Sequence, residues 1–161
     1  MDYKKELERV RSNKCLDSMP SNPWQFRVSI ADCDDQAISK MLEVIELIAK
    51  YSGNEWLSDD QWREVMPLWL KAAIPELTKE QTDKLLAETP QSQWDSLPWE
   101  FLSWLDAVRD RGWLWWGYRL EGAEAVIVVH IGMLPERIDA FKELIRALGM
   151  EIKGEVYSGL N

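Results

Sequence analysis

The 161-residue chain contains little cysteine, and it has no long apolar run. Its two cysteines, Cys15 and Cys33, are not in a Cys-x-x-Cys spacing, which argues against zinc binding or redox chemistry and predicts two reduced thiols. No apolar run approaches the roughly 20 residues that span a bilayer. The segment from Met1 to Arg11 is charged throughout, unlike a secretory leader. We therefore expect a cytoplasmic protein without a membrane segment.

The sequence also lacks the motifs that mark common catalytic and metal sites. It has no glycine-rich phosphate loop, no His-Glu-x-x-His and no dinucleotide fingerprint. Asp32, Asp34 and Asp35 lie together, but the glycine and glutamate of a calcium loop are missing, so helix capping explains them better. The single histidine, His130, ends an apolar run and is expected to form structural hydrogen bonds. We expect no metal, no cofactor and no catalysed reaction.

Positive charge is also scarce. There are 28 acidic and 19 basic residues, and the formal net charge is -9. This balance opposes direct binding to nucleic acid or to an anionic membrane and favours a basic partner. Solubility alone explains such a charge equally well.

Aromatic and β-branched residues are abundant between Trp113 and Ile131. Two β-rich runs flank a short polar turn there, which predicts a β-hairpin. Because strand side chains alternate, Trp113 and Trp115 are expected on the face opposite Leu114. Both faces carry large apolar groups, so we expect both to be covered.

The remaining elements complete a recognisable order. A strand is expected at 24–30, a helix from about residue 35 to Ser52, a second helix after Pro135 and a last strand at 151–157. The order βαββαβ resembles the ferredoxin-like fold, an antiparallel sheet with two helices on one face. This α+β resemblance is topological, covers about 100 residues, and implies no particular function. We expect one domain, 1–161, with a core of 24–53 and 113–158 and an N-terminal arm or short helix in 1–23.

Residues 54–112 interrupt that order as a helical insertion. Two capping boxes, Ser58-x-x-Gln61 and Thr78-x-x-Gln81, predict helix starts, and Pro67 is expected to kink or split the first helix. A third helix is expected near Pro98. Because Trp113 and Trp115 need cover, we expect the insertion to lie partly over the sheet face that the two long helices leave open.

The insertion concentrates both acidic and indole side chains. It holds 12 of the 28 acidic residues, 6 of the 19 basic residues and six of the ten tryptophans. An aromatic anchor rimmed by carboxylates is typical of a binding hot spot. In overall character the chain resembles bacterial immunity proteins, which implies that it binds and neutralises a cognate basic toxin, for example a nuclease. The expected contacts are Trp56, Asp59, Asp60, Glu64, Trp94, Asp95 and Glu100.

Two alternatives remain open. The first is a small-molecule binding or sensing module with an aromatic pocket between sheet and insertion, lined by Trp113, Trp115, Tyr118 and His130. An enzyme of the ferredoxin-like type ranks third, by analogy alone. In any of these cases, pairing through an outer strand would give a homodimer.

Overall fold

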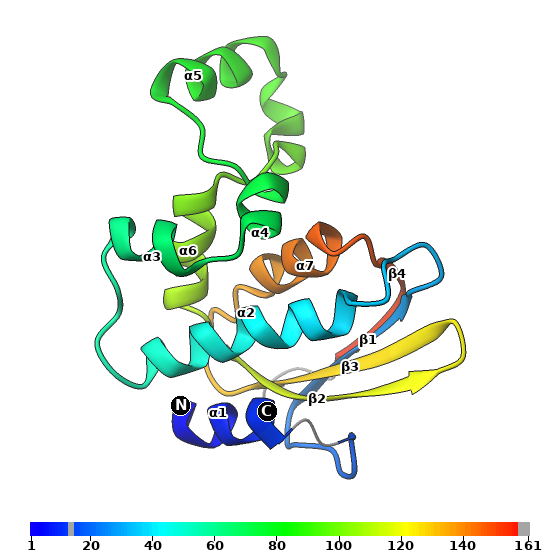
Figure 1. Ribbon diagram of the computed structural model, residues 1–161. Coiled ribbons are helices and arrows are strands. Elements are labelled where there is room, and N and C mark those ends of the chain that lie inside the picture. The colour runs from blue at the N-terminus through cyan, green and yellow to red at the C-terminus, as the bar shows by residue number, and fades with distance from the viewer. Residues whose placement is uncertain (13–14, 158–161) are drawn as a thin grey trace.

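The computed structural model describes residues 1–12 and 15–157 and shows an α+β protein (Figure 1). Residues 13–14 of the predicted arm and residue 158 of the predicted core lie outside the described residues. The elements in chain order are α1 (Tyr3–Ser12), β1 (Pro23–Ser29), α2 (Ala37–Ser52), α3 (Asp59–Val65), α4 (Leu68–Ala73), α5 (Lys79–Glu88), the 3₁₀ helix η1 (Gln91–Ser96), α6 (Phe101–Arg109), β2 (Trp113–Glu121), β3 (Glu124–Ile131), α7 (Ile138–Ala147) and β4 (Glu151–Tyr157). Within this part of the chain, no helix is both long and apolar enough to cross a membrane.

The described strands form one antiparallel sheet in the order β2-β3-β1-β4. Phe26 on β1 is opposite Ile127 on β3, and both side chains are fully buried. A register shift between Trp115 and Gly117 interrupts the β2–β3 ladder. Such a bulge reverses which face the following side chains occupy.

The faces of β2 differ from the expectation. Trp113 and Trp115 point toward the helices, since their rings lie 4.9 and 6.5 Å from the ring of Phe141 on α7. Tyr118 joins them on this face, 6.4 Å from Trp115, because the bulge reverses the alternation. The assignment of Trp113 and Trp115 to the face away from the helices was wrong: alternation groups side chains without telling which group meets the helices.

The insertion also lies elsewhere than expected. Helices α2, α6 and α7 lie on one side of the sheet (Figure 1). The buried indole of Trp104 on α6 donates to the Ala140 carbonyl on α7 at 2.9 Å, so α6 extends the helical layer. The insertion therefore does not cover the opposite sheet face. The reason is that its apolar stripe finds its partners on α7 and α2.

The face opposite α2 and α7, here called the far face, is covered from the N-terminal side instead. Leu16 donates its backbone N–H to the Tyr118 carbonyl at 2.9 Å. Trp116 donates its indole N–H to the Ser18 carbonyl at 2.7 Å. The segment predicted as an arm thus lies along β2 and crosses part of the far face. Helix α1 precedes it and packs on α2 and β2.

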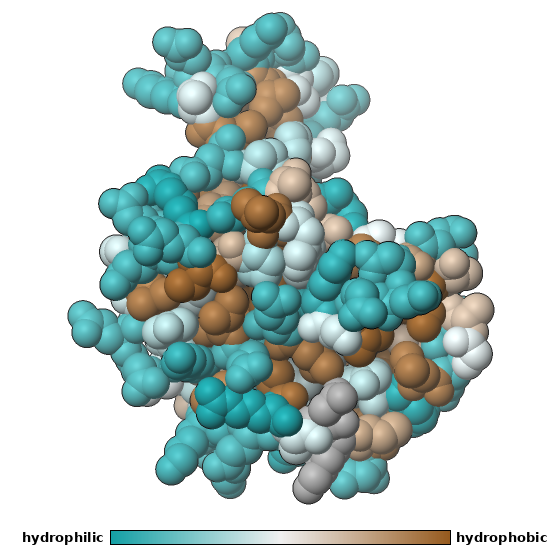
Figure 2. Space-filling model, viewed as in Figure 1, coloured by the Kyte–Doolittle hydropathy of each residue, from teal (hydrophilic) through white to brown (hydrophobic). Residues whose placement is uncertain are grey.

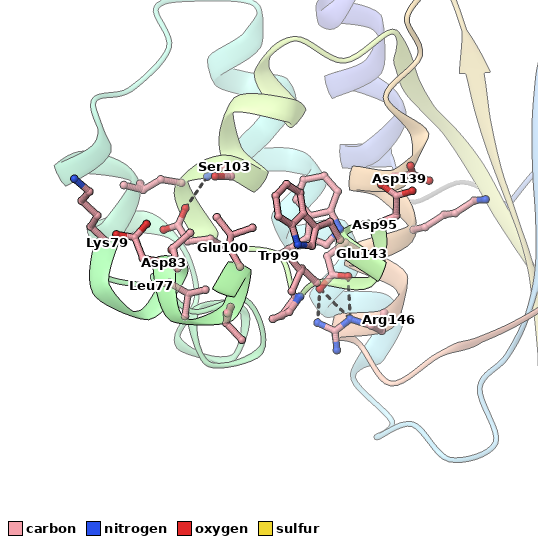
Figure 3. A pocket seen from close by; sticks show the side chains of 18 residues that line it. Leu77, Lys79, Asp83, Asp95, Trp99, Glu100, Ser103, Asp139, Glu143 and Arg146 are labelled. Atoms are coloured by element: carbon pink, nitrogen blue, oxygen red, sulfur yellow. Dashed lines mark hydrogen bonds and ion pairs between the residues drawn. The ribbon is translucent and has the colours of Figure 1, made fainter. Parts of the chain in front are cut away.

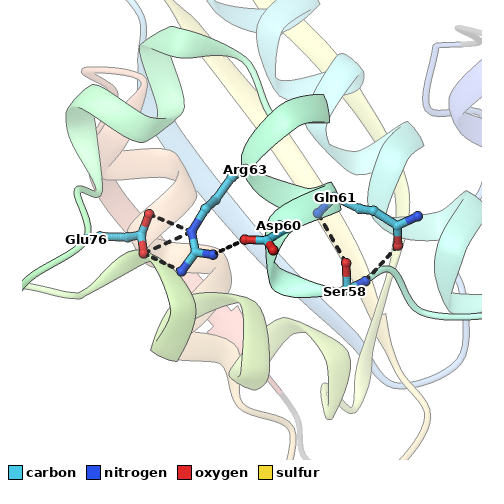
Figure 4. Close-up of polar contacts among 5 residues, drawn as sticks. All are labelled: Ser58, Asp60, Gln61, Arg63 and Glu76. Carbon is cyan, nitrogen blue, oxygen red and sulfur yellow. Dashed lines mark hydrogen bonds and ion pairs between the residues drawn. The ribbon is translucent and has the colours of Figure 1, made fainter.

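The helix boundaries at α3 and α4 follow the local sequence. Ser58 and Gln61 form the predicted capping box, with bonds of 3.0 and 3.2 Å (Figure 4). Pro67 separates α3 from α4, as expected for a residue that lacks a backbone donor.

Arg63 on α3 binds both Asp60 and Glu76 (Figure 4). The hydrogen bonds that Arg63 donates to Glu76 depress the pKa of Glu76, because they stabilise its charged form.

The outer strand β4 leaves one sheet edge without a partner strand among the described residues. A register shift lies within its pairing to β1 at Arg27 and Val28, and Glu151, Lys153 and Glu155 place charges along it. Bulges and charged side chains oppose pairing between free edges. Homodimer formation through β4 stays a prediction.

Candidate functional site

The segment from Pro75 to Glu100, here called the lobe, projects from the body of the molecule (Figures 1 and 2). It contains α5 and η1, and neither helix has a buried residue. The Phe101 N–H donates to the Pro75 carbonyl at 3.2 Å, which joins the two ends of the lobe. A helix that buries nothing in the core gains little from tertiary packing, so the lobe relies on local interactions.

Local capping is the clearest of those interactions. Thr78 Oγ1 accepts from the Gln81 N–H at 3.1 Å, and Gln81 Oε1 accepts from the Thr78 N–H at 2.9 Å. This is the capping box that the sequence predicts. It fixes where α5 begins.

Replacing Thr78 with alanine is expected to destabilise α5 by about 0.5–2 kcal/mol, because an N-cap acceptor is lost. The change should appear as faster amide hydrogen exchange in α5, with the midpoint of global urea unfolding nearly unchanged. Ser58→Ala, at the matching position of α3, is the control, since α3 carries the buried Trp62. Slower or unchanged exchange in α5 of the Thr78 variant would contradict the local origin of its stability.

A groove of about 1220 Å³ lies between the lobe and helices α6 and α7. Figure 3 shows Leu77 and Asp83 of the lobe on one side and Asp139, Glu143 and Arg146 of α7 on the other. The apolar part of the lining comes mainly from leucine and tryptophan. Its members include Leu85, Leu86, Trp94, Leu97, Trp99 and Leu102.

The cations that α7 contributes to the groove are already engaged. Lys142 binds Glu155 on β4 at 2.9 Å, and Arg146 binds Glu143. The hydrogen bonds that Arg146 donates to Glu143 raise the pKa of the Arg146 guanidinium, because they stabilise its charge. Lys79 is the lining cation for which the described part of the chain supplies no carboxylate within 4.0 Å.

The groove carboxylates are less compensated. Glu100 caps α6, accepting from the Ser103 N–H at 2.9 Å. Asp83, Asp95 and Asp139 have no described lysine or arginine within 4.0 Å. Three uncompensated carboxylates therefore surround an apolar floor. This arrangement attracts a cationic side chain attached to an apolar surface.

The structure divides the predicted partner-binding residues into two groups. Trp94, Asp95 and Glu100 line the groove. Trp94 is 42% exposed, although its indole donates to the Thr89 carbonyl at 3.0 Å. The α7 side of the groove was missed, because its residues are distant in sequence from the lobe. The sequence feature that could have indicated a groove is the pair of leucines in α5, Leu85 and Leu86, which do not belong to the hydrophobic core.

The other predicted contacts lie near α3 and do not line the groove: Trp56, Asp59, Asp60 and Glu64. The Trp56 ring packs 4.7 Å from that of the fully buried Trp62, so it belongs partly to the core. Asp60 already binds Arg63 at 2.6 Å. Two carboxylates, Asp59 and Glu64, remain exposed on this surface.

The alternative pocket between sheet and insertion does not form as expected. Trp113 is fully buried against α7, and its indole donates to the Arg137 carbonyl at 3.2 Å. His130 lies on the far face, with Nδ1 2.6 Å from the Ser21 carbonyl. Trp113 and His130 therefore lie on opposite sides of the sheet. They therefore cannot share one pocket.

The described residues also include no group of three His, Cys, Asp or Glu side chains placed to hold a metal ion. Cys15 and Cys33 are free thiols. Burial, with the nearby charges of Asp32 and Asp34, raises the pKa of the Cys33 thiol, which lowers the fraction of reactive thiolate. Comparison of the sequence with protein-family models, curated proteins and solved structures found no match.

Proposed function

We propose that this chain is an immunity-type protein that binds and neutralises a basic bacterial toxin, for example a nuclease, in the cytoplasm. The groove beside the lobe is the docking site. The observation that carries the proposal is an apolar floor surrounded by the uncompensated carboxylates Asp83, Asp95 and Asp139. In a chain with a net charge of -9, these groups favour encounter with a positively charged protein.

The groove offers the partner both an anchor and a charge contact. Trp94 presents part of its ring at the groove, and buried aromatic anchors contribute most strongly to protein interfaces. Lysine or arginine of the toxin would pair with the carboxylates, while an apolar side chain fills the space along Leu85 and Leu86. The lobe has few fixed contacts with the body, which suits adjustment on binding.

The same proposal includes a ferredoxin-like core that carries the lobe. Support comes from the antiparallel strand order β2-β3-β1-β4 and from α2 and α7, which lie on one side of the sheet (Figure 1). Fold alone does not imply function, so the groove carries the functional argument.

The test is co-expression of the full chain with the product of each neighbouring gene in a bacterial host that this product kills. We expect the chain to restore growth against one basic product and to form a complex with it. Trp94→Ala should weaken that complex by at least about 2 kcal/mol, roughly thirtyfold, because it removes an interface anchor. Asp139→Lys should weaken it by a comparable factor through charge repulsion.

Asp59→Lys on α3 is the matched control, because it makes the same charge change outside the groove. Its complex should keep nearly the original affinity. Equal weakening by Asp59→Lys and Asp139→Lys would show binding without the groove. No protection by the chain, or protection only against neutral or acidic products, would contradict the proposed function.

A further inference from the structure

A second, smaller cavity lies on the other side of the sheet from the groove. It has a volume of about 240 Å³ and is formed by α1 and the adjoining ends of β2 and β3. Leu114 and Trp116 supply an apolar wall, and Arg9, Lys5 and His130 supply polar groups. Two carboxylates also line the cavity, but Glu6 is paired with the buried Arg111 and Asp2 lies 3.9 Å from Lys5. Pockets that bind drug-sized ligands have volumes of about 300–1,000 Å³, so this smaller cavity suits a ligand with a single ring.

Arg9 is the charged group that makes this cavity specific. Its guanidinium carbon lies 3.5 Å from the centroid of the Trp116 ring, which is a stacked geometry. Among the described residues, no carboxylate lies within 4.0 Å of Arg9, whereas Arg11 on the same helix binds Glu46 at 2.9 Å. Stacking uses the face of the guanidinium and leaves its N–H edge available for an anion.

Trp116 and His130 are held in place by backbone groups. The Trp116 indole is bonded to the Ser18 carbonyl, and its ring centroid lies 6.4 Å from that of His130. A carbonyl oxygen only accepts, so the short contact with Ser21 assigns a proton to His130 Nδ1. In the neutral ring, Nε2 is then an acceptor, and it lies beside Gly132 in the cavity lining.

We propose that this cavity binds a small planar aromatic carboxylate. The ring lies against Leu114, beside the stacked Arg9 and Trp116, and the carboxylate accepts from the N–H edge of Arg9. Lys5 lines the same cavity and adds positive charge, although it also lies 3.9 Å from Asp2. The Nε2 atom of His130 accepts from a hydroxyl or amino substituent on the ring. This site is separate from the groove and does not depend on the proposed toxin binding.

The test uses benzoate and its neutral analogue benzamide as probes of the full chain. Binding is followed through the indole N–H resonances of the ten tryptophans by NMR, with Trp116 assigned from Trp116→Phe. Benzoate should shift the Trp116 resonance saturably. Benzamide should bind about tenfold or more weakly, because a charge-assisted hydrogen bond is lost. Shifts confined to Trp94 or Trp99 of the groove would overturn the proposal, as would the absence of saturable binding.

Three variants separate the contributions. Arg9→Gln should lower benzoate affinity to that of benzamide, whereas Arg119→Gln, the same charge change on β2, should leave it unchanged. Gly132→Leu should abolish binding of both probes, because a side chain there enters the cavity, with its Cβ 3.0 Å from Met1 Sδ and 3.5 Å from His130 Nε2. Equal effects of Arg9→Gln and Arg119→Gln, or full binding by Gly132→Leu, would overturn the proposal. A well-dispersed NMR spectrum of each variant shows that the variant is folded.

Discussion

Replacing Arg111 with methionine is expected to lower the free energy of unfolding by about 3–5 kcal/mol. Arg111 is fully buried, and its Nη2 lies 2.6 Å from Oε1 of Glu6, which is also buried. The same guanidinium donates to the carbonyls of Trp113 and Val108 and to the Ser52 hydroxyl. Methionine fills similar space but leaves a buried carboxylate without its cation, which is the costly outcome.

The loss should depend on pH with a defined sign. Burial raises the pKa of Glu6, and the favourable effects of Arg111 and the Trp115 N–H offset this only in part. Removing Arg111 raises the pKa of Glu6 further. Such a carboxyl has a higher pKa in the folded protein than in the unfolded chain. It contributes its full stability at pH values below the unfolded-state pKa, and this contribution is lost as the pH rises through the folded-state pKa. The deficit of the variant should therefore be larger at about pH 8 than at about pH 5.

Urea unfolding of the variant and the original chain at both pH values measures this deficit. Arg109→Met is the control, because Arg109 pairs with Asp106 and Asp110 at the surface and should cost at most about 1 kcal/mol. The double change Glu6→Met with Arg111→Met should recover part of the loss, because no charge is then left buried. A deficit below about 1 kcal/mol, or one independent of pH, would contradict the assigned role of the pair.

The Glu6–Arg111 pair could not be predicted from the sequence, in contrast to the local features of the fold. The capping boxes, the break at Pro67 and the β-hairpin were predicted correctly, because each depends on residues close together in the chain. Glu6 and Arg111 are 105 positions apart, and each resembles an ordinary surface charge among its neighbours in the sequence. Only the docking of α1 on β2 makes them a buried pair.

The bulge in β2 and the groove were missed for a related physical reason. Strict alternation from Leu114 would place Tyr118 on the same face as Trp116, but the register shift after Trp115 moves Tyr118 to the helix side. No local residue pattern predicts this register shift. In the same way, the partner contacts predicted from the sequence include Trp94, Asp95 and Glu100, which line the lobe side of the groove, whereas Asp139 belongs to a wall formed by a later helix.

Trp104→Ala is the second change expected to have a large effect, a loss of about 3–5 kcal/mol in unfolding free energy. Trp104 is fully buried, so truncation leaves a large cavity, and its bond to the Ala140 carbonyl of α7 is also lost. Because this residue joins α6 to α7, the loss should affect the insertion and the sheet core together. Circular dichroism and tryptophan fluorescence should report coincident urea transitions.

Trp94→Ala provides the contrast, since it removes the same side chain from a partly exposed position on the lobe. Its unfolding free energy should change by only about 0.5 kcal/mol, whereas the proposed function expects the same change to weaken partner binding strongly. Trp104→Phe should fall between the two alanine variants, because it keeps much of the ring but loses the indole hydrogen bond to the Ala140 carbonyl. Separate transitions for the insertion and the core in Trp104→Ala would show two independent units instead of one cooperative domain.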